Sequence, residues 1–141
     1  LKGGVAYLSE QAFVTRTAKT GVIGWCMGGG LARELSQGSD KVGPTVICYG
    51  SVTTDPDQVA KLKGKAILGI FGATDRGIPV EKVKEFGEML GTAKIDREVN
   101  VYPGAGHGFM RPGGPQYEKA GAASAWTAIE GFFARTLKPK A

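Results

Sequence analysis

Four short apolar runs, each bounded by glycine, recur along the chain. β-Branched and aromatic residues dominate them, which is typical of β-strands. The runs are GVIGW at 21–25, VGPTVICYG at 42–50, AILGIFG at 66–72 and EVNVYPG at 98–104. We therefore expect four strands.

Helical patterns lie between these strands. In residues 80–91 apolar positions recur every three or four residues with charged residues between them, which predicts an amphipathic helix. Helices are also predicted over 5–18, 27–37 and 115–137, with Pro115 in the first turn of the last one. Alternating strands and helices indicate an α/β protein with a three-layer αβα architecture and a short, mostly parallel sheet of about four strands.

The composition is that of an ordinary globular domain, and 141 residues suffice for one such domain. The net charge of +5 is the one unusual feature. Its lysines are spread along the chain, except for Lys61, Lys63 and Lys65 and for Lys138 and Lys140 near the end. Because no nucleic-acid-binding module accompanies them, we interpret them as solvated surface and expect no nucleic acid partner.

The first 20 residues contain neither a secretory signal nor a membrane-spanning run, and two cysteines do not make a disulfide framework. We therefore expect a cytoplasmic protein without a membrane role. A disulfide between Cys26 and Cys48 stays open as an alternative. One histidine and two separated cysteines offer no ligand cluster, so neither a metal nor another cofactor is expected.

The segment GWCMG at 24–28 has the form of a nucleophile elbow, in which a nucleophile occupies a sharp turn from a strand into a helix. Gly24 and Gly28 are expected because a side chain at either position would collide with its neighbours. The thiol of Cys26 would project over the first amides of the helix. Those amides lower a thiol pKa and can bind an oxyanion, so the amide of Met27 is the candidate donor.

Two further candidates follow later strands. Asp75 comes after the strand at 66–72, and His107, the only histidine, comes after the strand at 98–104. Taken singly, a cysteine at a strand end is usually a packing residue, an aspartate a helix cap and a histidine a loop residue. Here they occur in the order nucleophile, acid, base at the carboxyl ends of predicted parallel strands, which favours a Cys26–His107–Asp75 triad.

The segments GWCMGGG, GATDRGIP and YPGAGHGF resemble motifs of the carboxyl-terminal part of the dienelactone hydrolase family of α/β-hydrolases. The resemblance covers nearly the whole chain. It implies that residues 1–141 form a single domain with a truncated α/β-hydrolase fold, which lacks the usual amino-terminal strands and the loop that supplies a second oxyanion amide. It also implies Cys26 as nucleophile, His107 as general base and acid, and Asp75 as the group that orients the imidazole.

The resemblance further implies hydrolysis of a carboxylic ester or lactone through an acyl-cysteine intermediate. Arg111, four residues after His107, would bind a substrate carboxylate, although a solvated loop arginine is the alternative. Tyr49 and Trp25 are candidate pocket residues, and core packing is the alternative for Tyr49. Two other functions stay open, namely attack on phosphorus esters and a catalytically silent binding or assembly module.

The strand at 21–25 leads to a prediction about assembly. In the whole family fold this strand is paired on both sides, and its Val22, Ile23 and Trp25 carry no charge that would protect an open edge. We therefore expect a second copy to cover that edge, which would give a homodimer or a higher homo-oligomer.

Overall fold

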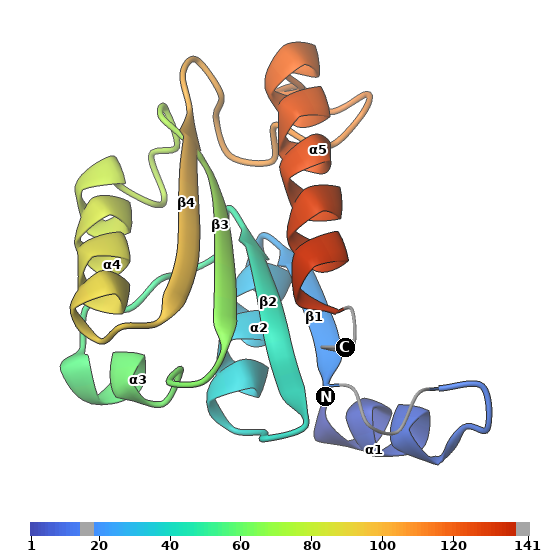
Figure 1. Cartoon of the computed structure of the whole chain (residues 1–141). Helices are drawn as coiled ribbons and strands as arrows, with labels where there is room; N and C mark the ends of the chain where they lie inside the picture. The colour runs from blue at the N-terminus through green and yellow to red at the C-terminus, as the bar shows by residue number, and fades with distance from the viewer. Residues whose placement is uncertain (15–18, 138–141) are drawn as a thin grey trace.

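The computed structural model describes residues 1–14 and 19–137 (Figure 1). Helices and strands alternate along the chain after an initial helix. They are α1 (Lys2–Glu10), β1 (Thr20–Trp25), α2 (Met27–Gln37), β2 (Val42–Cys48), α3 (Pro56–Ala60), β3 (Ala66–Gly72), α4 (Val80–Thr92), β4 (Asp96–Tyr102) and α5 (Lys119–Thr136).

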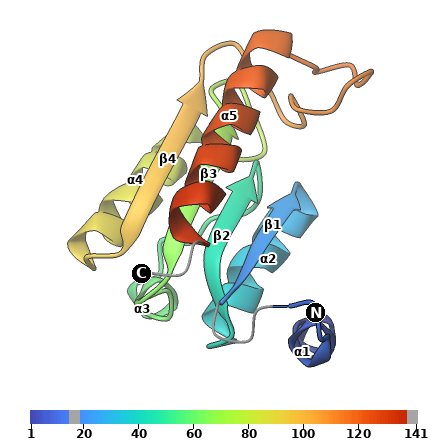
Figure 2. The same ribbon diagram turned by 45° about the vertical axis from the view of Figure 1, so that its right-hand side comes forward.

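The four strands form one parallel sheet in the order β1-β2-β3-β4. Helices α2, α3 and α4 lie on one face and α5 covers the other, as Figures 1 and 2 show from two directions. The predicted three-layer α/β architecture is therefore confirmed. Because the strands are parallel, their carboxyl ends meet at one edge of the sheet, where the loops that carry the candidate residues also lie.

Each face of the sheet has its own apolar core. Alternate residues of the central strands point to opposite faces, so Val46 and Leu68 face α5 whereas Ile47 and Ile67 face α3 and α4. The large side chains in both cores are fully buried. This packing on both faces holds β2 and β3, the strands that lead into the site, in a fixed position.

Several predicted boundaries differ from the structure, and the strand predicted over 98–104 is observed at Asp96–Tyr102. The last helix begins at Lys119, because the side chain of Glu118 caps the amides of Ala120 and Gly121; Pro115 lies in the preceding turns, so its predicted place in the helix is wrong. The strand predicted over 42–50 ends at Cys48. The first helix ends at Glu10, and residues 15–18 of the predicted range lie outside the described residues.

Two local features were not anticipated. The short helix α3 begins after Asp55, whose side chain accepts hydrogen bonds from the amides of Asp57 and Gln58. Lys65, which the sequence predicts to be solvated, is only 8% exposed, and its ammonium group donates to the carbonyl oxygens of Ser39 and Val42. That interpretation is wrong for Lys65, because its ammonium group links the start of β2 to the turn before β3.

Strand β1 lies at the edge of the sheet and pairs only with β2 among the described residues. Most of its residues are half-buried. The homo-oligomer expected from this edge stays a prediction. Within residues 1–14 and 19–137, no helix has the length and apolar character needed to cross a membrane.

Candidate active site

Cys26 occupies a sharp turn between β1 and α2. Its backbone has φ 59° and ψ −125°, an unusual conformation for a residue with a side chain. Its amide donates to the carbonyl oxygen of Cys48 at 3.0 Å, which ties the turn to the end of β2. The thiol is exposed at the carboxyl edge of the sheet, as expected for a nucleophile elbow.

The glycines around this turn do not have equal roles. A Cβ on Gly24 would overlap the carbonyl oxygen of Gly28, and a Cβ on Gly50 would lie 2.6 Å from the Cα of Gly29. A Cβ on Gly28 would meet nothing within 4 Å outside its own helix and neighbours. The predicted collision is therefore confirmed at Gly24 and wrong at Gly28. The crowding at Gly24 comes from the backbone of Gly28 and Gly29, which lies where a Gly24 side chain would be.

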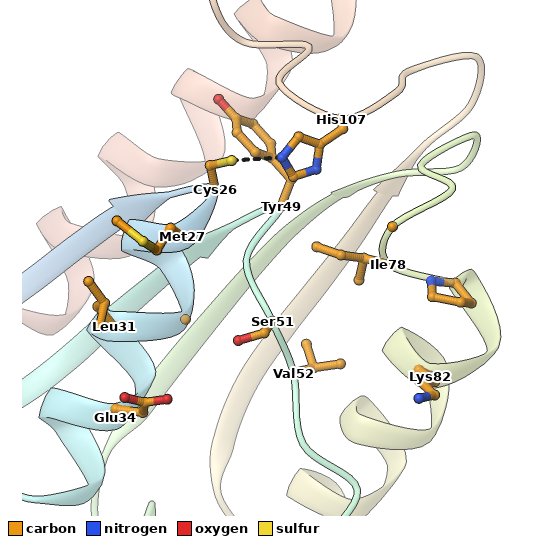
Figure 3. A pocket seen from close by; sticks show the side chains of 13 residues that line it. Cys26, Met27, Leu31, Glu34, Tyr49, Ser51, Val52, Ile78, Lys82 and His107 are labelled. Carbon is orange, nitrogen blue, oxygen red and sulfur yellow. Dashed lines mark hydrogen bonds between the residues drawn. The ribbon is translucent and has the colours of Figure 1, made fainter.

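The structure brings the three candidate residues together. The Sγ atom of Cys26 lies 2.7 Å from Nε2 of His107 (Figure 3). On the other side of the ring, Nδ1 of His107 lies 2.8 Å from Oδ2 of Asp75. The second carboxylate oxygen of Asp75 accepts hydrogen bonds from the amides of Gly77 and Ile78. The buried Asp75 is thus held in place and fixes the imidazole against the thiol.

These contacts favour an ion pair between the thiol and the imidazole. The hydrogen bond with His107 lowers the pKa of the Cys26 thiol; partial burial opposes this effect, and the amide of Met27 adds to it. The pKa of His107 is raised, first by the contact with Cys26 and then by Asp75, against the opposing effect of burial. Burial raises the pKa of Cys48 to about 12, so its thiol stays protonated. The two cysteines differ sharply in reactivity as a result.

A first prediction follows from the direction of these shifts. Because the Cys26 pKa is lowered, thiolate is present below the pH at which an ordinary cysteine ionises, and iodoacetamide should label Cys26 there and leave Cys48 unmodified. In His107→Ala the main cause of the shift is absent, so the midpoint of labelling should move to higher pH. Labelling rates between pH 5 and 9, resolved by peptide mapping, measure both effects. Equal labelling of the two cysteines, or an unmoved midpoint, would contradict the prediction.

Both cysteines are free in the structure. Cys48 belongs to the buried cluster that packs beneath α5, whereas Cys26 faces His107. The disulfide considered from the sequence is therefore not formed, and the Cys26 thiol is available for chemistry.

Two cavities open beside the Cys26–His107 pair, and Cys26, His107 and Tyr49 line both. The first, of about 520 Å³, lies between the amino-terminal part of α2, the loop after β2 and the start of α4, and its lining includes Met27 and Lys82 (Figure 3). The second, of about 560 Å³, lies toward α5. A substrate bonded to the thiol would thus have room on both sides of the reacting carbon.

The second cavity contains the other predicted binding residues. Trp25 and Arg111 line it together with Trp126, and the ring centroids of the two tryptophans are 6.0 Å apart. Arg111 is exposed and has no carboxylate partner among the described residues. Trp126 is a site residue that the sequence motifs do not indicate. The feature that could have indicated it is a large aromatic side chain on α5 that is 44% exposed between the buried Ala125 and Ile129.

Comparison with known proteins identifies the family and the fold of the chain. The fold and the elbow define an α/β-hydrolase. The chain belongs to the dienelactone hydrolase family, whose family model matches residues 2–137.

Two curated relatives are named as candidate carboxymethylenebutenolidases. One, from Saccharolobus solfataricus, is 34% identical over 132 residues, which are 94% of this chain and 49% of the relative. The other, from Escherichia coli K12, is 30% identical over 120 residues, which are 79% of this chain and 44% of the relative. The chain thus spans about half the length of these relatives.

A solved structure shares the fold. It is the dienelactone hydrolase-like promiscuous phosphotriesterase P91 from metagenomic libraries, with a TM-score of 0.82 and 23% identity over 97% of this chain and 60% of that chain.

Proposed function

We propose that this protein hydrolyses carboxylic esters or lactones with Cys26 as nucleophile. The observation that carries the proposal is the continuous contact from the Cys26 thiol through His107 to the buried Asp75. The family and the names of the curated relatives point to the same reaction class. A module without catalytic activity would have no need for a strained, exposed thiol held against an imidazole.

Acylation begins from the thiolate–imidazolium pair. The thiolate of Cys26 adds to the ester carbonyl carbon, and the amide of Met27 donates to the oxygen that becomes negative. When the carbon–oxygen bond to the leaving group breaks, Nε2–H of His107 donates its proton to the departing alkoxide. The products are the free alcohol, an acyl-cysteine and a neutral imidazole.

Deacylation reverses these roles. Neutral His107 takes a proton from a water molecule, whose oxygen adds to the acyl carbon, and the carbon–sulfur bond then breaks. The carboxylic acid leaves, and the thiolate–imidazolium pair forms again. The Asp75 carboxylate accepts a hydrogen bond from Nδ1–H of His107 and stabilises the imidazolium, and the 2.8 Å between Nδ1 and Oδ2 suits this role.

Each cavity would hold one side of the substrate. Trp25, Trp126 and Tyr49 give the second cavity aromatic walls, which suit an apolar or aryl group. Arg111 at the same cavity would bind a carboxylate on the substrate, because a guanidinium pairs well with that group. The proposed substrate is therefore a small ester or lactone with an apolar portion.

The proposal is tested with the full chain on p-nitrophenyl acetate and a simple aryl lactone. We expect release of p-nitrophenol above the buffer rate. Mass spectrometry of the protein, quenched in acid during turnover, should find one acetyl group on the peptide that contains Cys26. Hydrolysis without this acyl group at any substrate concentration would contradict the acyl-cysteine route, and the absence of both turnover and acylation would favour the binding-module alternative.

A further inference from the structure

A buried arginine joins the helix of the nucleophile to the loop after β2. Arg33 lies on α2, which begins directly after Cys26, and only 8% of the residue is exposed. Its Nε–H donates to the carbonyl oxygen of Ser51 at 3.1 Å, and its Nη1 donates to Oε1 of Gln37 at 3.0 Å. Its Nη2 lies 3.6 Å from the carboxylate of the exposed Glu34. The guanidinium therefore connects α2 with the loop.

The loop depends on this contact for its position. Residues 50–54 contain no helix or strand. Among residues 1–14 and 19–137, the contact with Arg33 is the only hydrogen bond that joins these residues to another helix or strand. Val52 packs against the apolar cluster beneath α4, but apolar contact is not directional. The hydrogen bond from Arg33 thus holds the loop at a defined distance from α2.

Small residues let the loop and α2 approach each other closely. A Cβ on Gly30 would overlap Oγ of Ser51, and a Cβ on Gly29 would lie 2.9 Å from the Cα of Gly50. The loop therefore rests directly on the backbone of the helix near its start. Arg33, less than one turn after Gly30, holds it there.

This junction forms part of the wall of the first cavity. Ser51 and Val52 line the cavity from the loop, and Leu31 lines it from α2. Figure 3 shows Ser51 and Val52 between the side chains of α2 and Lys82 of α4. A shift of the loop relative to α2 would therefore change the width of the cavity beside the thiol.

The stability of the fold alone does not explain a buried charge at this position. Taking a guanidinium out of water is costly, and apolar side chains of similar volume often stabilise a fold at least as well. The guanidinium adds geometry, because its planar group donates to two acceptors in fixed directions. In Arg33 these acceptors are the loop carbonyl of Ser51 and the side chain of Gln37, which in turn donates to the carbonyl oxygen of Gln58 on α3.

We propose that Arg33 is a positioning residue that sets the width of the first cavity and thereby selects substrates by the size of the group that they place there. The inference rests on the proposed hydrolase function and names a determinant of substrate size for that site. Arg33 takes no part in the bond changes and acts through Ser51 and Val52.

The test compares Arg33→Met with Lys65→Met. Methionine keeps an unbranched apolar chain at each position and removes the charged donor. Lys65 is the matched control, because it is also 8% exposed and donates to two backbone carbonyl oxygens, but it lies before β3, at the opposite end of the sheet from the thiol. Val52→Ala is the reference variant, since it widens the first cavity directly.

Two series of esters are hydrolysed by each variant. One series varies the acyl chain of p-nitrophenyl esters from acetyl to hexanoyl, and the other varies the leaving group of acetate esters from phenyl to naphthyl. The series in which Val52→Ala favours the larger members is the one that places its varied group in the first cavity. Steady-state kinetics and iodoacetamide labelling of Cys26 are measured for every variant.

In that series, we expect Arg33→Met to raise kcat/KM for the largest member relative to the smallest by about three- to tenfold, chiefly through KM, and to leave the other series within about twofold. The rate and pH midpoint of Cys26 labelling should stay those of the wild type, because Arg33 contacts neither the thiol nor His107. Lys65→Met should keep the wild-type ratios in both series.

Four results would overturn the inference: unchanged ratios in Arg33→Met, an equal change in both series, the same change in Lys65→Met, or a Val52→Ala variant that alters neither series. If circular dichroism shows that Arg33→Met does not fold, Arg33→Lys is used in its place, because a single ammonium group lacks the planar pair of donors. A wild-type protein that neither hydrolyses an ester nor becomes acylated would reject the proposed function and this inference together. An active wild type with unchanged ratios in the Arg33 variant rejects the inference alone.

Discussion

Replacing Cys26 by alanine is expected to lower kcat/KM for p-nitrophenyl acetate by about a thousandfold or more, because the thiol that contacts Nε2 of His107 and would carry the acyl group is then missing. The variant should stay folded, since the thiol is exposed and alanine fits the same turn. Initial rates of hydrolysis, at a protein concentration high enough to detect a thousandfold loss, measure the activity. Circular dichroism shows whether the variant is folded. Full activity in Cys26→Ala would end the assignment of this residue as nucleophile.

Cys48→Ala is the matched control for this experiment. Cys48 is fully buried and packs beneath α5, and burial raises its pKa to about 12, so it takes no part in the proposed chemistry. We expect this variant to lose some stability through the small cavity and to keep wild-type kcat/KM. A large loss of activity in Cys48→Ala with the fold intact would indicate that general damage, rather than a missing nucleophile, explains Cys26→Ala.

Substitution of the other two candidates extends the same test. His107→Ala should lose about as much activity as Cys26→Ala, because the three side chains act as one unit. Asp75→Asn should lose at least about tenfold in activity but the least of the three variants. The asparagine side chain can still contact Nδ1, but it lacks the charge that stabilises the imidazolium. An Asp75→Asn variant that was more damaged than His107→Ala, with its fold intact, would contradict these roles.

The sequence allowed the candidate triad to be predicted because of a property of parallel sheets. Residues that follow the carboxyl ends of parallel strands meet at one edge, whatever their separation in the chain. Cys26, Asp75 and His107 each follow such a strand, and the strands were recognisable from their apolar runs between glycines. The order of the elements was therefore enough to bring together side chains as much as 81 positions apart.

The features that the sequence did not reveal depend on contacts between distant segments. Lys65 resembled a surface lysine, and only the fold shows the two carbonyl oxygens that its ammonium group reaches. Trp126 faces the site because of the way α5 crosses the sheet, which no local pattern specifies. Tyr49 contacts the ring of His107 from a backbone with positive φ, and the sequence does not indicate that conformation.

The glycines of the elbow also show that the sequence motif does not reveal contacts between segments. The motif contains both Gly24 and Gly28, but only Gly24 is crowded in the structure. Any side chain at Gly24 must displace the backbone at Gly28, where the turn that holds Cys26 leads into α2. Gly28 has open space around it outside its own helix, and in a helix alanine is more favourable than glycine. The motif glycine that matters for the turn is therefore the one before the nucleophile.

We expect Gly24→Ala to lower the free energy of unfolding by about 3 kcal/mol or more, because backbone atoms at this crossing have no room to relax. The displaced turn should also slow iodoacetamide labelling of Cys26 and ester hydrolysis by at least about tenfold in the protein that remains folded. Gly28→Ala should stay within about 1 kcal/mol of the wild type and keep its labelling rate. Urea denaturation followed by circular dichroism, with labelling under native conditions, measures both variants.

Equal stability of the two variants would contradict this prediction. It would show that the turn can shift to accept a methyl group at Gly24, and that the close approach of Gly24 to Gly28 does not hold the nucleophile in place.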